Sequence, residues 1–160
     1  MDMDEIIIPE DGLVFRTPDG RPVLQITTDG MASVLNLFSA NNQSRLSLVC
    51  EDELCGVLVQ NGNKSVELTS GTTNNEIRFT NENRKVTHFF YTTDEGGQIG
   101  LADKDGDLII SMGTNGDTGA SIVINNKDGV GVAAIMNYYD RGYISLVDGD
   151  GREIWKMPKD

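Results

Sequence analysis

Apolar residues recur along this chain in pairs separated by one residue, before and after a series of turn-like segments. The pairs before the turns are Leu13/Phe15, Leu35/Leu37, Val57/Val59, Ile77/Phe79, Ile99/Leu101, Ile122/Ile124 and Ile144/Leu146. The pairs after the turns are Leu24/Ile26, Leu46/Leu48, Val66/Leu68, His88/Phe90, Ile110/Met112, Ala133/Ile135 and Trp155/Met157, and only His88 is not apolar. Alternate side chains of a β-strand point to opposite faces, so this pattern predicts about 14 short strands that share one apolar face.

The turns inside each pair of strands recur at a nearly constant spacing. They are Thr17–Gly20, Asn41–Asn42, Asn61–Gly62, Asn83–Arg84, Asp103–Gly106, Asn126–Gly129 and Asp148–Gly151. Asp-Gly and Asn-Gly sequences favour tight hairpin turns because their residues tolerate positive φ. We therefore predict one all-β domain over residues 1–160, built from hairpin repeats of about 22 residues. The expected repeats span residues 11–28, 29–50, 51–71, 72–92, 93–114, 115–138 and 139–160.

A sheet with one apolar face has to cover that face in water, and the sequence leaves several arrangements open. The sheet can coil on itself as a meander or solenoid. The hairpins can form a propeller-like array, or several chains can pack together as an intertwined trimeric β-prism. Single hairpins are marginally stable, and end hairpins leave unpaired edges, so we expect a coiled array that forms a homo-oligomer.

The repeat unit resembles a family of uncharacterised bacterial proteins made of tandem repeats of similar length. The segments that carry the resemblance are Gln98–Met112, Ala120–Met136 and Tyr143–Met157. The last repeat also ends in a tail, Asp150–Pro158, that is similar to the "dG-x-x-IW-x-x-P" tail of that family. The resemblance implies a hairpin-repeat fold, and it implies no activity or catalytic residue.

The charge of the chain limits its partners. The formal net charge is -12, and so acidic a surface repels phosphate backbones and anionic lipid. We expect neither a nucleic-acid nor a membrane partner. The N-terminal segment has no basic region followed by an apolar stretch, which indicates a cytoplasmic protein or one released without a classical signal peptide. The two cysteines, Cys50 and Cys55, are expected to be a reduced pair of small hydrophobic residues.

One turn carries alternating carboxylates that can present oxygens to a hard cation. Asp103, Asp105 and Asp107 form this weak calcium candidate. The flanking segments are predicted strands, and Thr114 occupies the place where an EF-hand needs a bidentate glutamate. Aspartate is also a preferred turn residue, so the sequence favours turn chemistry and implies no other cofactor.

Two aromatic features are candidates for interactions. Tyr138, Tyr139 and Tyr143 surround Arg141 at the connection into the last repeat. Aromatic side chains beside polar ones are typical of protein or glycan contacts. Trp155 lies in the apolar face of the last predicted strand, where no following repeat covers it, so it is a candidate oligomer contact.

The sequence offers no catalytic arrangement. Its single histidine, His88, falls on the apolar face, and no general-base partner is evident near it. We therefore expect a non-catalytic structural or assembly protein, a self-associating repetitive β-scaffold. The alternative is a module that binds a glycan or a protein through turns on one edge of the array. The turns at residues 72–75, 94–97 and 115–119 are the candidates for that edge.

Overall fold

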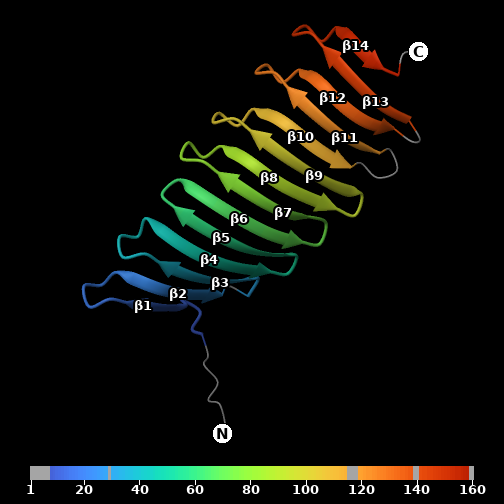
Figure 1. Cartoon of the computed structure of the whole chain (residues 1–160). Coiled ribbons are helices and arrows are strands. Elements are labelled where there is room, and N and C mark those ends of the chain that lie inside the picture. Colours follow the sequence, from blue (N-terminus) through green and yellow to red (C-terminus); the bar gives the residue numbers. More distant parts are fainter. Residues whose placement is uncertain (1–7, 29, 115–118, 139–140, 159–160) are drawn as a thin grey trace.

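The computed structural model describes residues 8–28, 30–114, 119–138 and 141–158. It is a single antiparallel sheet of 14 strands that follow one another in chain order (Figure 1). The strands are β1 (Leu13–Arg16), β2 (Pro22–Thr28), β3 (Ala32–Phe38), β4 (Ser44–Glu51), β5 (Leu54–Asn61), β6 (Lys64–Gly71), β7 (Asn75–Thr80), β8 (Val86–Thr93), β9 (Gly96–Ala102), β10 (Leu108–Thr114), β11 (Ala120–Asn125), β12 (Gly131–Tyr138), β13 (Arg141–Val147) and β14 (Glu153–Met157). The predicted all-β meander of seven hairpins is confirmed.

The register brings the predicted apolar positions of all the strands onto one face, in two continuous rows. The turn-side ladder, nearer the hairpin turns, is Phe15, Leu24, Leu37, Leu46, Val59, Val66, Phe79, His88, Leu101, Ile110, Ile124, Ala133, Leu146 and Trp155. The link-side ladder is Leu13, Ile26, Leu35, Leu48, Val57, Leu68, Ile77, Phe90, Ile99, Met112, Ile122, Ile135, Ile144 and Met157. These two ladders together are the apolar face, and the opposite side is the second face.

The hairpin turns follow the conformation that the sequence predicts. The last residue of each predicted turn has positive φ; these residues are Gly20, Asn42, Gly62, Arg84, Gly106, Gly129 and Gly151. Four turns are also closed by the side chain of a residue at their start, which for the Asn83–Arg84 turn is Asn81, two residues earlier. Oδ1 of Asn81, Asp103, Asn126 and Asp148 accepts backbone N–H bonds from the residues two and four positions later. Asn and Asp recur at turn starts because they make these bonds.

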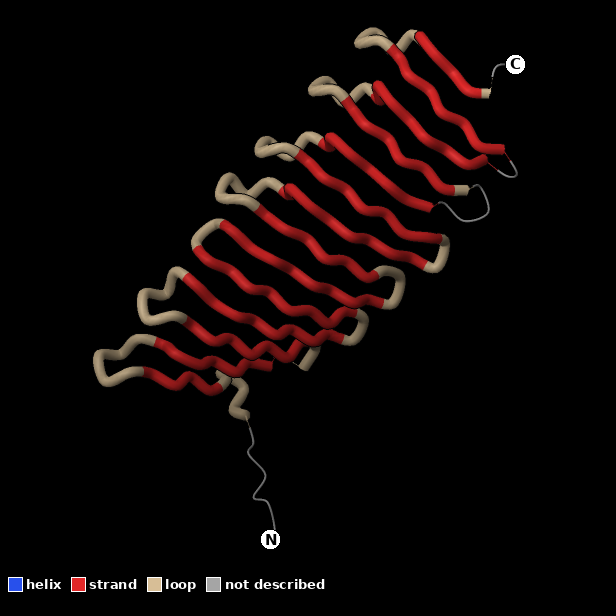
Figure 2. The backbone as a smooth tube through the Cα atoms, viewed as in Figure 1, coloured by secondary structure: helices blue, strands red, loops and turns tan. Residues whose placement is uncertain are grey.

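The sheet is open rather than closed on itself. Its strand order begins at β1 and ends at β14, and no pairing joins these two strands. Figure 2 shows them at opposite ends of one continuous sheet. The chain therefore forms neither a closed roll nor a radial set of blades, and it does not cover its own apolar face.

The open sheet exposes far more surface than a compact protein of its mass. A folded monomer of 17.4 kDa exposes about 7,900 Å², whereas this chain exposes 11567 Å². Among the residues that the structure describes, no hydrophobic side chain is buried, and Ser47 on the second face is the one buried polar residue. The described part of the single chain therefore has no hydrophobic core of its own.

The cysteines correct one sequence-based expectation. Cys50 at the end of β4 lies directly opposite Cys55 at the start of β5, and the two form a disulfide. The expectation of a reduced pair is therefore wrong. The bond closes the short link between these strands, where Cα atoms 4.2 Å apart bring the two side chains together.

Candidate functional site

The apolar face is the largest unusual surface of the molecule. Many ladder residues stay substantially exposed, including Phe15 at 51%, Phe90 at 43% and Met157 at 57%. Fully burying one such side chain contributes about 1.5–3 kcal/mol, so half-exposure forgoes roughly 1 kcal/mol at each position. Over two ladders that loss exceeds the whole net stability of a typical domain, about 5–15 kcal/mol.

His88 interrupts the turn-side ladder with a polar ring. Its Nδ1 lies 3.0 Å from Oγ1 of Thr87, and its ring meets Phe79 edge-on with centroids 5.8 Å apart. Leu101 is its neighbour on the other side. This is the position that the sequence predicts for His88, and its ring contacts are those of a packing residue.

Trp155 lies at the end of the same ladder. It pairs with Leu146 on β13 and is 41% exposed on the last strand of the sheet. In the described part of the chain, β14 is the last strand of the sheet, and only β13 pairs with it. Its position agrees with the one the sequence predicts, and its role as an oligomer contact stays a prediction.

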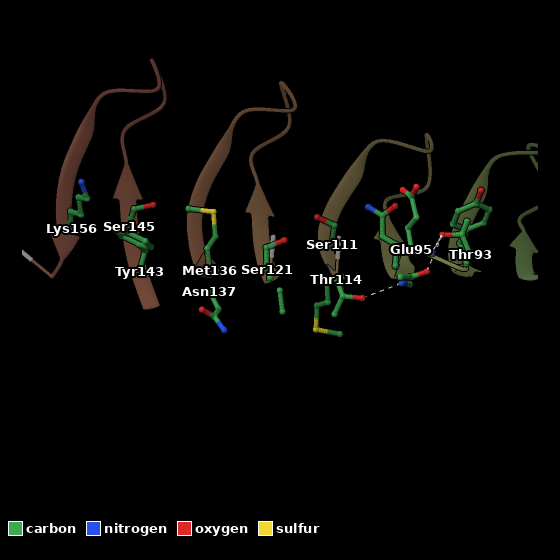
Figure 3. Close-up of a pocket in the computed structure, with 18 of the residues that line it drawn as sticks. Thr93, Glu95, Ser111, Thr114, Ser121, Met136, Asn137, Tyr143, Ser145 and Lys156 are labelled. Atoms are coloured by element: carbon green, nitrogen blue, oxygen red, sulfur yellow. Dashed lines mark hydrogen bonds between the residues drawn. The ribbon is translucent and has the colours of Figure 1, made fainter. Parts of the chain in front are cut away.

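The second face carries a groove that crosses the C-terminal half of the sheet. It has a volume of about 770 Å³, which is within the range of about 300–1,000 Å³ typical of ligand sites. Figure 3 shows several of its side chains in a row along successive strands. The lining residues are Tyr91, Thr93, Glu95, Gly96, Gly97, Gln98, Ser111, Met112, Gly113, Thr114, Gly119, Ala120, Ser121, Met136, Asn137, Tyr143, Ser145, Glu153 and Lys156.

The register explains why these residues share one row. Tyr91 pairs with Gln98 across β8 and β9, and Ser121 pairs with Met136 across β11 and β12. Met136 in turn pairs with Tyr143 on β13. The two tyrosine rings thus mark the two ends of the row. They are five strand spacings apart, which is about 24 Å.

The groove is weakly charged and combines apolar surface with hydrogen-bonding groups. Hydroxyl and amide side chains and four glycines are prominent among its lining residues. The carboxylates of Glu95 and Glu153 are the acidic groups, and Nζ of Lys156 lies 5.8 Å from the centre of the Tyr143 ring. Such a lining offers many hydrogen bonds and an aromatic surface without a strong net charge.

The tyrosine cluster expected from the sequence is only partly described. Tyr143 lies in the groove, and Arg141 is exposed at the start of β13. The backbone of Tyr138 pairs with Arg141, whereas Tyr139 lies outside the described residues. The sequence pattern did not single out Gln98, Ser121 or Lys156. Counting the register outward from the turns places Gln98 and Ser121 in the row of Tyr143, and Lys156 in the row beside it.

Two of the three carboxylates in the candidate calcium turn, those of Asp103 and Asp105, have partners within the protein. The backbone N–H groups of Asp107 and Asp105 donate to the Asp103 carboxylate and lower its pKa from the ordinary value. The Asp105 carboxylate lies 2.7 Å from Nζ of Lys104 and raises the pKa of that lysine. No group of three potential ligands with metal-binding geometry occurs within residues 8–28, 30–114, 119–138 and 141–158. Calcium binding by this turn stays a prediction, and the geometry supports turn anchoring.

The sequence was compared with family models and with curated proteins. The chain matches no family model and no curated protein. Within the described part of the chain, no helix is long and apolar enough to cross a membrane.

Proposed function

We propose that this protein is a non-catalytic scaffold that assembles with copies of itself through the apolar face. The observation that carries the proposal is a pair of ladders across 14 strands that is apolar at every position except His88, with no hydrophobic core in the described part of the chain. The surface excess of about 3,700 Å² over a compact monomer is several times the roughly 800 Å² that each partner buries in a standard interface. The apolar face of a second copy is large enough to cover the apolar face of the first.

The chemistry of the ladders supports a copy of the same chain as the occupant. Their side chains are mostly medium-sized aliphatic residues at regular strand spacing, which suits packing against an identical surface. Identical faces are self-complementary about a symmetry axis, as in closed homo-oligomers. The second face then stays in water, and the net charge of -12 of the whole chain supports solubility.

The proposal assigns no reaction to the protein. His88 packs against Phe79 within the apolar face, which the assembly covers. Glu95 lines the groove from the link between β8 and β9, and Glu153 lines it from β14. The regularity of the repeats instead suits a scaffold.

Two neighbouring residues of β12 test which face is covered. Ile135 lies on the apolar face and is 53% exposed in the single chain, and Met136 lies on the second face at 38%. In the assembly we expect the thiol of Ile135→Cys to react with a maleimide at least tenfold more slowly than that of Met136→Cys. In an isolated chain, position 135 is the more exposed of the two and should be labelled faster. Faster labelling at position 135 therefore contradicts the proposal. Labelling of both variants in denaturant is the control.

A second candidate function is supported by the groove. An uncharged glycan matches its lining, because aromatic faces stack on sugar rings while amides and hydroxyls bind sugar hydroxyls. The groove also takes in residues of the 94–97 link, which the sequence named as a candidate binding turn. The row from Tyr91 to Tyr143 lies on the second face, so these groove residues stay open when the apolar face is covered.

The groove predicts a specific loss of binding. On an array of neutral oligosaccharides, we expect wild-type protein to bind at least one extended chain, with affinity measured by calorimetry. Tyr143→Ala should weaken that affinity about tenfold, which is about 1.4 kcal/mol. The control, Val147→Ala on the same strand, lies outside the groove and should bind as wild type. Absence of binding at millimolar oligosaccharide, or equal loss in both variants, contradicts this function.

A further inference from the structure

Each of the two end strands of the sheet has one backbone edge that is not paired with another described strand. Strand β1 has only β2 as a neighbour, and β14 has only β13. Both ladders stop at these strands, with Phe15 51% exposed on β1 and Met157 57% exposed on β14. Open sheet edges offer unpaired N–H and C=O groups to another strand, and natural proteins usually block them with proline, lysine or short irregular strands. The sequence of β1, LVFR, contains neither proline nor lysine, although the strand has only 4 residues. Strand β14, EIWKM, carries one lysine, Lys156, on its second face.

The direction of the strands allows the sheet to continue from one copy to the next. Each strand is antiparallel to the one before it, so β14 runs in the same sense as β2. Strand β3 follows β2 inside the chain, and β1 has the sense of β3. A copy of β1 placed beside β14 therefore continues the antiparallel order without a break.

The internal pairing of β2 with β3 gives the register of such a junction. Leu24 and Ile26 of β2 pair with Leu37 and Leu35 of β3. On β14, Trp155 occupies the place of Leu24, since both face the turn-side residue of the preceding strand. The equivalent junction pairs Trp155 with Phe15 of the next copy.

The same register fixes two further contacts. It places Met157 opposite Leu13 and Lys156 opposite Val14 of the next copy, so that both ladders run on without interruption. The pairing ends there, because Pro158 has no N–H to donate.

Charges at the turn end of the junction are complementary. Glu153 pairs with Val147 at the bulge of its hairpin, just as Pro22 pairs with Arg16 in the first hairpin. In the inferred register Glu153 therefore lies on the second face next to Arg16 of the following copy. Arg16 donates one N–H to the carbonyl of Gly20, which holds the guanidinium at this corner and leaves its other N–H groups for a carboxylate.

We propose that β14 of one copy pairs antiparallel with β1 of the next, in the register Trp155 to Phe15, to build a head-to-tail filament. Such an interface joins two different surfaces and does not close, so repetition makes a fibre. The proposal extends the assembly proposed above by adding a second contact, and the edges can pair whether or not the apolar faces associate.

Disulfide trapping tests the register directly. Val14→Cys and Lys156→Cys proteins are prepared separately, mixed and oxidised; the native cysteines are already joined to each other. Directly paired positions have Cα atoms about 5 Å apart, within disulfide range. We expect the mixture to give a cross-linked dimer joining position 14 to position 156, identified by peptide mapping. The matched control mixes Val14→Cys protein with Ser145→Cys protein. Ser145 is the pairing partner of Lys156 on β13, one strand away from the sheet edge, so this mixture should give at least tenfold less product.

The outcomes separate this inference from the proposed face-to-face assembly. Absence of a 14-to-156 product, or a mixture dominated by 14-to-14 and 156-to-156 products, overturns the head-to-tail junction. Repeating the trapping with Phe90→Glu added to both proteins removes the apolar-face contact at a site six strands from β14. Product retained in that background supports the junction on its own, even if the apolar faces prove not to associate.

Discussion

Replacing Phe90 with glutamate should dissociate the assembly and lower its melting temperature by about 10 °C. Phe90 lies in the link-side ladder at the centre of the sheet, between Ile77 and Ile99. If another copy covers this face, the substitution buries a carboxylate without a partner, which costs several kcal/mol. In a domain of this size each kcal/mol shifts the melting temperature by about 2–4 °C. Thermal unfolding followed by circular dichroism measures the shift.

The next residue along the same strand supplies the control. Tyr91 is also aromatic and is 36% exposed, but it lies on the second face. Tyr91→Glu therefore places the same charge on the same strand while leaving it in water, and its melting temperature should stay within about 3 °C of wild type. Equal melting temperatures for both variants would mean that the apolar face is not covered.

Replacing Gly100 with alanine should destabilise the sheet by about 1–3 kcal/mol. Gly100 on β9 is buried because the ring of Phe89, its pairing partner on β8, lies across it. A Cβ atom at this position would occupy the space of the Phe89 ring edge. The ring therefore has to turn away or the strands have to separate. Chemical denaturation should show the loss as a lower midpoint with an unchanged slope.

A second strand glycine makes the comparison specific. Gly142 on β13 has no atom within 4 Å of where a Cβ would be. Gly142→Ala should be neutral, or stabilising by up to about 1 kcal/mol, because alanine restricts the unfolded chain more than glycine does. Combining Gly100→Ala with Phe89→Ala should recover part of the loss, since the clash is removed. Equal effects of the two glycine substitutions would contradict the ring contact.

The sequence pattern predicts most of this architecture because a meander is built from local rules. Strand alternation assigns each residue to a face, and the turns set the pairing, so the two ladders follow from spacing alone. The positive φ of Asn42 and Arg84 was also predictable, although neither is glycine. Their place in the repeat, and not their residue type, indicates the turn.

Other features depend on how the sheet bends and on what covers it. Alternation does not say whether a sheet coils, and here the strands stay in an open row with β1 and β14 apart. The groove depends on side-chain sizes along the second face, where Gly113 and Ser121 leave space between larger neighbours. To predict the Cys50–Cys55 bond one needs the register of β4 against β5. Counting residues from the turns on either side gives that register.

The mass of the wild-type protein in solution shows whether the apolar face is covered by another copy. Light scattering after size exclusion, over a hundredfold range of protein concentration, measures this mass without any substitution. Assembly through the apolar face should give a species of at least twice the chain mass of 17.4 kDa, whose β-sheet signal is lost when it dissociates on dilution. A folded monomer of 17.4 kDa at every concentration would show that one chain sustains this sheet alone, and it would contradict assembly through the apolar face.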